Sequence, residues 1–139
     1  MKIQPGLSPV QQSAAAALLE GLSVGGVLAL LGEAGTGKTT ILRHLHALRG
    51  GAFIVVREFA QGLRAIEDAL HAHDLLLVDD LHLVTYIVGR HNDPRIYIID
   101  AELTALLAES TALRKTILFT CRGRLPWPVA RRAYTFEIG

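Results

Sequence analysis

The residues best suited to chemistry in this 139-residue sequence form one glycine-rich stretch, "GEAGTGKT". In it, Gly32 is followed after four positions by Gly37, Lys38 and Thr39. Glycines let successive N–H groups face phosphate oxygens, the lysine reaches the β and γ phosphates, and the threonine hydroxyl ligates Mg²⁺. The alternative is a chance glycine-rich turn, but the complete spacing favours phosphate binding. We therefore expect a nucleotide to contact Glu33, Ala34, Gly35, Thr36, Gly37, Lys38, Thr39 and Thr40.

The elements on either side of this stretch are those that phosphate binding requires. "VLALLG", residues 27–32, is an unbroken apolar run that suits a central buried strand. "TTILRHLHALRG" follows, and it places four apolar residues on one helical face before two glycines end the helix. The arrangement is strand, loop, helix, so the positive end of the helix meets the phosphates.

Two carboxylates end another apolar run, "LLLVDD" at residues 75–80. Mg²⁺ bound to phosphates prefers oxygen ligands and keeps several waters, so an acid on a neighbouring strand is its expected companion. Asp79 fills that place, which makes Asp79 and Thr39 the candidate metal ligands. Asp80 is a candidate general base for the attacking water. The alternative for Asp80 is a helix cap or a solvated acid.

The rest of the chain alternates short strands with helices, a pattern typical of an α/β domain with a mostly parallel sheet. Ser8, Pro9 and Gln11 predict a capped helix through residues 9–22. Further helices are expected at residues 63–73 and at residues 101–110, the latter with Asp100 as its cap. Between residues 81 and 99 we expect a long loop, with or without a short strand. Further strands are expected at residues 52–56, 116–120 and 134–138.

The strand at residues 116–120 is apolar until it ends in Thr120, and Cys121 and Arg122 follow. In the strand order of P-loop ATPases, a polar side chain here emerges beside the phosphate site. Thr120 is therefore a candidate for orienting the attacking water or sensing the γ phosphate. Alternatively, it only ends a strand.

Four arginines crowd the end of the chain around Trp127, namely Arg122, Arg124, Arg131 and Arg132. Together they suggest nucleic-acid contact with Trp127 as a stacking platform. The prolines on both sides of Trp127 fit a structural turn better. An arginine presented to a neighbouring subunit accelerates phosphoryl transfer by roughly 10³–10⁵. We assign that role to Arg131, with plain surface charge as the rival.

Composition sets limits on the partners. A formal net charge of +1 gives no field that argues for nucleic acid or anionic membrane. The single cysteine excludes an internal disulfide, and the apolar runs are far shorter than the ~20 residues of a membrane span. With no leader-like N-terminus, we expect a cytoplasmic protein. The pairs His44/His46 and His71/His73 have spacings that do not suit a helical zinc site.

These motifs together resemble the nucleotide-binding core of the AAA+ ATPases. "GEAGTGKT" is similar to that family's Walker A motif, "LLLVDD" to Walker B and "ILFTCR" to the sensor-1 strand. "ARRAYTFEIG" lies where the family carries its arginine finger and fifth strand. The Asp-Asp pair looks more like replication initiators and helicase loaders than like protein unfoldases.

The resemblance implies a three-layer αβα sandwich with a five-stranded parallel sheet in the order 5-1-4-3-2. It implies ATP or ADP with Mg²⁺ as ligands, and ATP hydrolysis in a homo-oligomer. Thr120 or Cys121 would be sensor 1, and Arg131 would act in a neighbour's site. AAA+ proteins follow the fifth strand with a helical lid, so residues 1–139 are expected to be one core domain, either a fragment or a lidless form.

Two other functions fit parts of the pattern. The Asp-Asp pair followed by "LH", and the later "RLPWPVAR", resemble the STAND signalling switches, in which bound nucleotide gates a partner surface with slow turnover. Gln11 lies where superfamily-one helicases carry an adenine-reading glutamine, although its capping role already explains it. The segment around "YIVGRHNDPRIYIID" is a candidate for client specificity, as long functional loops often are.

Overall fold

A five-stranded parallel sheet forms the middle layer in the computed structural model, which describes residues 7–56, 59–84 and 95–138. Its strands are β1 (Val27–Leu31), β2 (Ala52–Val55), β3 (Leu75–Asp79), β4 (Thr116–Cys121) and β5 (Tyr134–Glu137). They lie in the order β2-β3-β4-β1-β5, and every neighbouring pair is parallel. This is the predicted order 5-1-4-3-2 read from the other edge, so the fold class is confirmed.

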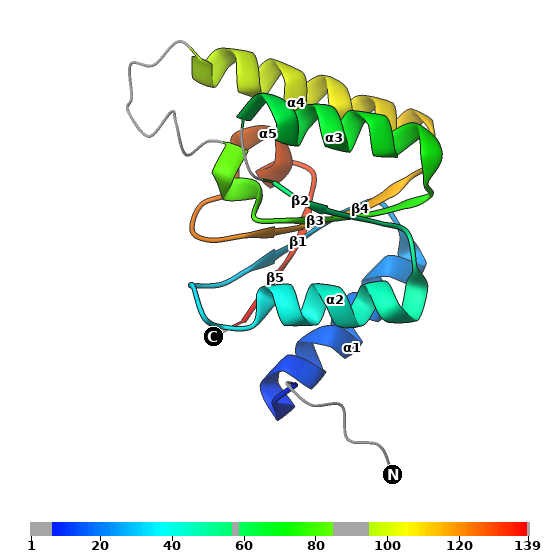
Figure 1. Cartoon of the computed structure of the whole chain (residues 1–139), viewed down its shortest axis with the longest axis vertical. Coiled ribbons are helices and arrows are strands. Elements are labelled where there is room, and N and C mark those ends of the chain that lie inside the picture. Colours follow the sequence, from blue (N-terminus) through cyan, green and yellow to red (C-terminus); the bar gives the residue numbers. More distant parts are fainter. Residues whose placement is uncertain (1–6, 57–58, 85–94, 139) are drawn as a thin grey trace.

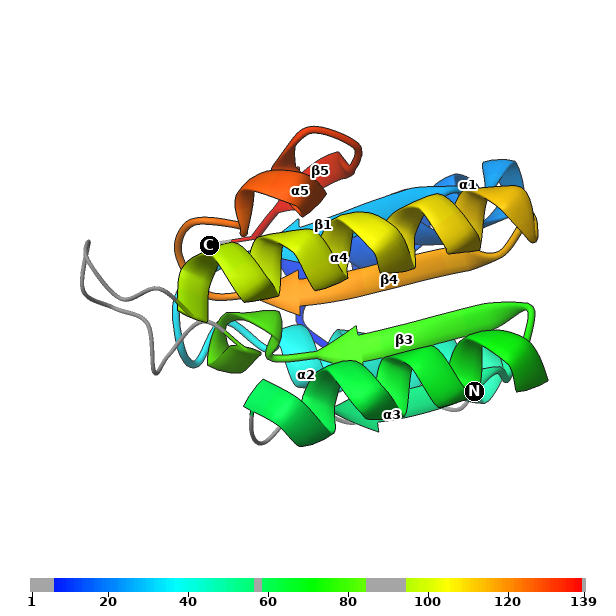
Figure 2. The ribbon, with the colours of Figure 1, turned by 90° about the horizontal axis from the view of Figure 1, so that it is seen from above.

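Helices cover both faces of the sheet (Figures 1 and 2). One face carries α1 (Pro9–Val24) and α2 (Lys38–Arg49). The other carries α3 (Phe59–Ala72), α4 (Arg95–Ala112) and the short α5 (Trp127–Ala130). The predicted three layers are therefore present. No helix among the described residues has the length and apolar character needed to cross a membrane.

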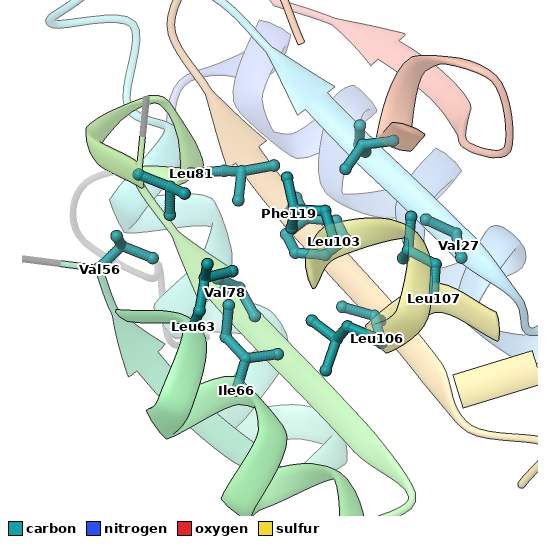
Figure 3. Close-up of a cluster of buried hydrophobic side chains, with 14 of the residues drawn as sticks. Val27, Val56, Leu63, Ile66, Val78, Leu81, Leu103, Leu106, Leu107 and Phe119 are labelled. Atoms are coloured by element: carbon teal, nitrogen blue, oxygen red, sulfur yellow. The ribbon is translucent and has the colours of Figure 1, made fainter. Parts of the chain in front are cut away.

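Alternation along the strands divides the buried side chains into two cores. Leu28, Leu30, Leu77 and Leu118 pack on the side of α1 and α2. The alternate residues of the same strands pack with α3 and α4 in the second core (Figure 3). This core includes Val27, Ala29, Val78 and Phe119. Because side chains alternate along a strand, the face of the sheet to which a residue near a strand end points follows from the residues before it. Asp79 and Thr120 share the parity of Leu77 and Leu118, so they face the layer that holds α2.

The start of α1 has the predicted cap. The Ser8 side chain accepts the Gln11 N–H at 3.2 Å, and the Gln11 side chain accepts the Ser8 N–H at 3.0 Å. Pro9 occupies the first turn, where its missing N–H costs no hydrogen bond. The sequence signature of a capping box is thus realised in the structure.

The expectations for residues 81–110 need correction. Asp100 does not cap a helix, because α4 begins at Arg95 and already includes it. Ile99 is 1% exposed and packs in the same core as Leu103, Leu106 and Leu107, so the apolar periodicity of α4 extends farther toward the N-terminus than we predicted. Of the expected loop, residues 81–84 form the 3₁₀ turn η1 (Leu81–Val84). The candidate specificity segment lies largely at residues 85–94, outside the described residues.

Two smaller differences concern the ends of helices. Helix α3 begins at Phe59, before the predicted start at Leu63. The predicted turn around Trp127 is a single helical turn, α5, with Pro126 as its N-cap and Pro128 in its first turn. Proline is compatible with the first turn of a helix, where no intrahelical donor is needed.

Candidate nucleotide-binding site

The candidate phosphate loop (Gly32–Thr39) connects β1 to α2 at the carboxyl end of the sheet. Gly35 and Gly37 have φ of +82° and +90°, a backbone conformation that residues with a side chain rarely adopt. Within the loop, the Thr36 hydroxyl donates to the Glu33 carbonyl at 2.8 Å. Gly37 is the N-cap of α2 and supplies no side-chain acceptor for the first-turn N–H groups. The helix therefore begins with donors and a positive dipole end that suit an anion.

Lys38 is 7% exposed, although it carries a charge. Its Nζ donates to the carbonyl oxygens of Gly32 at 2.6 Å and Glu33 at 2.8 Å. In the part of the chain that the structure describes, no carboxylate lies within ion-pair distance of it. A buried ammonium held by neutral carbonyls, with no carboxylate at ion-pair distance, gains from a bound anion that offsets its charge. The residues present therefore fit a bound phosphate.

Three predicted site residues from three different elements meet at one carboxylate. Thr39 of α2 donates its hydroxyl to Asp79 Oδ2 at 2.7 Å, and Thr120 of β4 donates to Asp79 Oδ1 at 2.5 Å. The Thr120 oxygen also accepts the Asp80 N–H at 2.9 Å. Asp79 and Thr120 are both almost fully buried. The parallel sheet therefore brings an acid and two hydroxyls together beside the start of α2.

Cys121, the other sensor-1 candidate, points to the opposite side of the sheet. It is fully buried in the core under α3 and α4. Its Sγ lies 3.7 Å and 3.8 Å from the carbonyl oxygens of Arg122 and Arg124. Burial raises the pKa of its thiol to about 11, so it remains a neutral thiol near neutral pH. Of the two candidates, only Thr120 contacts Asp79.

Asp80 adopts a left-handed backbone conformation with φ of +63°. Aspartate is one of the few residues other than glycine that tolerate this region. Its side chain is half-buried, and burial, followed by the neighbouring Asp79 carboxylate, raises its pKa above the ordinary value. Asp80 is thus a carboxylate with increased proton affinity at the edge of the candidate phosphate loop.

An open depression of about 350 Å³ joins these groups. It is lined by Ala34, Gly35, Gly37, Lys38, Thr39, Asp80, His82 and Arg122. Glu33, Thr36 and Thr40 belong to the same loop and first helical turn but do not line it. The depression thus combines five of the predicted nucleotide contacts with the candidate base.

His82 and Arg122 line the depression although neither was assigned a role there. The Arg122 N–H donates to His82 Nδ1 at 3.1 Å, which ties the turn after β3 to the turn after β4. Burial lowers the pKa of His82 below its ordinary value, so the neutral ring is favoured. The two residues are forty positions apart, and no spacing pattern signals such a contact. Only the order of the strands could have suggested it.

Arg131 lies away from the depression, at the C-terminal end of α5. It is exposed, and its guanidinium carbon lies 4.5 Å from the centroid of the Trp127 ring, which is itself 62% exposed. The structure therefore does not bring Arg131 to the site of its own chain. Its placement on the surface leaves both sequence-based roles, finger or plain charge, open to test.

Comparison with known proteins gives a match in structure but none in sequence. No protein family matches the chain, and no curated protein matches it significantly. Among solved structures, the chain resembles domain III of the replication initiation protein DnaA from Thermotoga maritima, with a TM-score of 0.60 and 16% identity. The similarity covers 100% of this chain and 69% of that one. At this identity the likeness shows a shared fold alone, which agrees with the αβα fold and five-stranded parallel sheet expected from the motifs.

Proposed function

We propose that the chain binds ATP with Mg²⁺ and hydrolyses it to ADP and phosphate, as an ATPase core that acts side by side with further copies of itself. The observation that carries this proposal is the buried Lys38 ammonium, which donates to two carbonyl oxygens and, among the described residues, makes no ion pair with a carboxylate; it lies next to the start of α2, which has no side-chain cap. The fold shared with DnaA domain III supports it.

The hydroxyl of Thr39 and the carboxylate of Asp79 would hold Mg²⁺, because hydroxyl and carboxylate oxygens suit this ion. When bound, Mg²⁺ would offset the negative charge of the phosphates. Among the described residues, no group of three or more His, Cys, Asp or Glu side chains is placed to hold a metal. Phosphate oxygens and water would therefore complete the ligands of an ion bound through Thr39 and Asp79.

The remaining groups have roles in the attack on the γ phosphate. Asp80 would accept the proton of the attacking water, a role favoured by its increased proton affinity. Thr120 would hold the carboxylate of Asp79 and the backbone of Asp80 in register through its two hydrogen bonds. Arg131 would reach the γ phosphate bound to a neighbouring copy, where an arginine stabilises developing charge.

The test is the rate of Mg²⁺-dependent ATP hydrolysis per chain over a wide range of protein concentration, with Lys38→Ala as the blank. We expect a rate that rises with concentration and falls to the blank in Lys38→Ala, which also loses ATP binding. Absence of ATP binding by the wild type would overturn the proposal. Tight binding with a rate equal to the blank at every concentration would instead favour the nucleotide-gated switch.

A further inference from the structure

The side chain of Gln11 joins the first turn of α1 to the candidate phosphate loop. Its Oε1 accepts the Ser8 N–H at 3.0 Å, as the capping box requires. Its Nε2 donates to the carbonyl oxygen of Thr36 at 3.1 Å, across 25 positions of sequence. A single amide group therefore fixes a helix end with one atom and the loop with the other.

The contact with the loop is close enough to restrict its sequence. A Cβ atom at Gly37 would lie 2.2 Å from Gln11 Nε2 and 2.9 Å from Cδ. Glycine at this position suits the left-handed conformation that starts α2, and a side chain here would in addition displace the Gln11 amide. Gln11 packs directly on the residue that precedes Lys38 and Thr39.

This arrangement bears on the possibility that Gln11 reads adenine. Both polar atoms of its amide, Oε1 and Nε2, have hydrogen-bond partners within the chain, one in the cap and one in the loop. The loop partner, Thr36, lies two residues before Lys38, whose side chain lines the depression. The contacts of Gln11 therefore point to the shape of the loop rather than to a base.

We propose that Gln11 is a positioning residue that clamps the candidate phosphate loop, so that nucleotide binding and the first turn of α1 stabilise one another. The proposal rests on the proposed nucleotide-binding function. A hydrogen bond that holds the loop in its binding shape lowers the cost of ordering it when the ligand arrives. Because coupling between two equilibria is reciprocal, a bound nucleotide must then stabilise the cap to the same extent.

Variants of the full chain separate the clamp from the cap. Gln11→Glu keeps the oxygen that accepts the Ser8 N–H but loses the donor to Thr36, and Gln11→Met loses both without adding charge. Ser8→Ala removes the other half of the cap and leaves the clamp. Gln12→Met is the matched control, because Gln12 is exposed and its side chain donates to Leu7 instead of the loop.

The first readout is the equilibrium affinity for ATP and Mg²⁺. We expect Gln11→Glu and Gln11→Met to weaken binding by about 3–10-fold, the usual range for one lost hydrogen bond. Ser8→Ala should weaken it by less than 2-fold, and Gln12→Met should leave it unchanged. The clamp is overturned if Gln11→Met binds like the wild type, since any effect of Gln11→Glu is then charge repulsion. It is also overturned if Ser8→Ala weakens binding as much as Gln11→Met.

The second readout is amide hydrogen exchange, which tests the clamp with and without nucleotide. Saturating ATP should slow exchange of the Gln11 N–H, which donates to Ser8, in the wild type but not in Gln11→Met. Without nucleotide, Gln11→Met should speed exchange across residues 35–39, and Gln12→Met should not. If the wild type binds no ATP, the proposed function fails, and this nucleotide-free comparison alone decides the clamp. Equal loop exchange in Gln11→Met and wild type would refute it.

Discussion

The depression beside Lys38 and the surface around Arg131 present positive charge in opposite ways. Lys38 is buried and held by two carbonyl oxygens at 2.6 Å and 2.8 Å. Arg131 is exposed and stacked on an exposed tryptophan. The first arrangement fixes a cation at a site within the chain, whereas the second presents a cation to the surroundings.

Under the proposed function, this difference separates the catalytic groups that one chain would supply from the group that a neighbouring copy would supply. The strand ends bring Asp79, Asp80 and Thr120 to the start of α2, so under the proposed function phosphate binding, metal coordination and the general base would need one copy only. An exposed stack of arginine on an aromatic ring is worth about 0.5–1 kcal/mol. Arg131 would therefore leave Trp127 at small cost if a neighbouring copy offered a phosphate, as the proposed function requires.

The largest effect that would sharpen this comparison is expected from Arg131→Ala. If Arg131 completes a neighbour's site, the hydrolysis rate per chain should fall by about 10³ with unchanged ATP affinity. The rise of the rate with protein concentration should also disappear. Rates and affinities measured beside Arg132→Ala, an exposed neighbour, supply the control. Equal rates in the two variants would show that Arg131 is plain surface charge.

A smaller loss is expected from Thr120→Val. Valine has a similar volume but removes the donor to Asp79 and the acceptor of the Asp80 N–H. Leaving these buried groups unpaired should lower the free energy of unfolding by about 1–3 kcal/mol, and we expect hydrolysis to slow by about 10² because the base loses its support. Thr120→Ser keeps the hydroxyl and should restore most of the rate.

Urea unfolding and steady-state rates of both Thr120 variants provide the measurement. The role of the hydroxyl would be contradicted if Thr120→Ser were as slow as Thr120→Val. Full activity in Thr120→Val would likewise show that Thr120 has only a structural role near the end of β4. Either result would show that the Thr120 hydroxyl is not part of the site at the strand ends.

Much of this fold is readable from the sequence because its signals are local. The capping box at Ser8 and Gln11 depends on residues three positions apart, and the strands are short apolar runs. The prediction that Asp100 caps a helix was wrong, because it relied on the residue type and not on the helical spacing of apolar residues, which extends back to Ile99. The residue type at position 100 predicted the start of the helix there, but the packing of Ile99 in the core places residue 100 inside the helix.

The site itself divides in the same way. Asp79 and Thr120 could be placed near one another because parallel strands end at one edge of the sheet. The choice between Thr120 and Cys121 required the side of the sheet, which depends on which helices cover each face. The contacts from Gln11 to Thr36 and from Arg122 to His82 span 25 and 40 positions. Such contacts follow from tertiary packing, and no periodicity encodes them.

The smallest effect concerns stability at Asp80. Because burial and Asp79 raise the pKa of Asp80, the folded protein holds its proton more tightly than the unfolded chain does. The ionised carboxylate therefore destabilises the fold at neutral pH, and this cost vanishes as the pH falls toward the ordinary aspartate value of about 3.9. Asp80→Asn should raise the melting temperature at pH 7 by about 2 °C, since the group is partly solvated.

Melting curves between pH 4.5 and 7 distinguish charge from backbone as the origin of this gain. If the charge is responsible, the advantage of Asp80→Asn is constant at high pH and shrinks as the pH falls through the raised pKa of Asp80 in the folded state. If it arises because asparagine tolerates the φ of +63°, the advantage is the same at every pH. Asp68→Asn on the exposed face of α3 controls for the loss of one negative charge. A pH-dependent gain in Asp80→Asn but not in Asp68→Asn would show that the surroundings of Asp80 favour its protonated form, and that its ionised carboxylate lowers the stability of the fold.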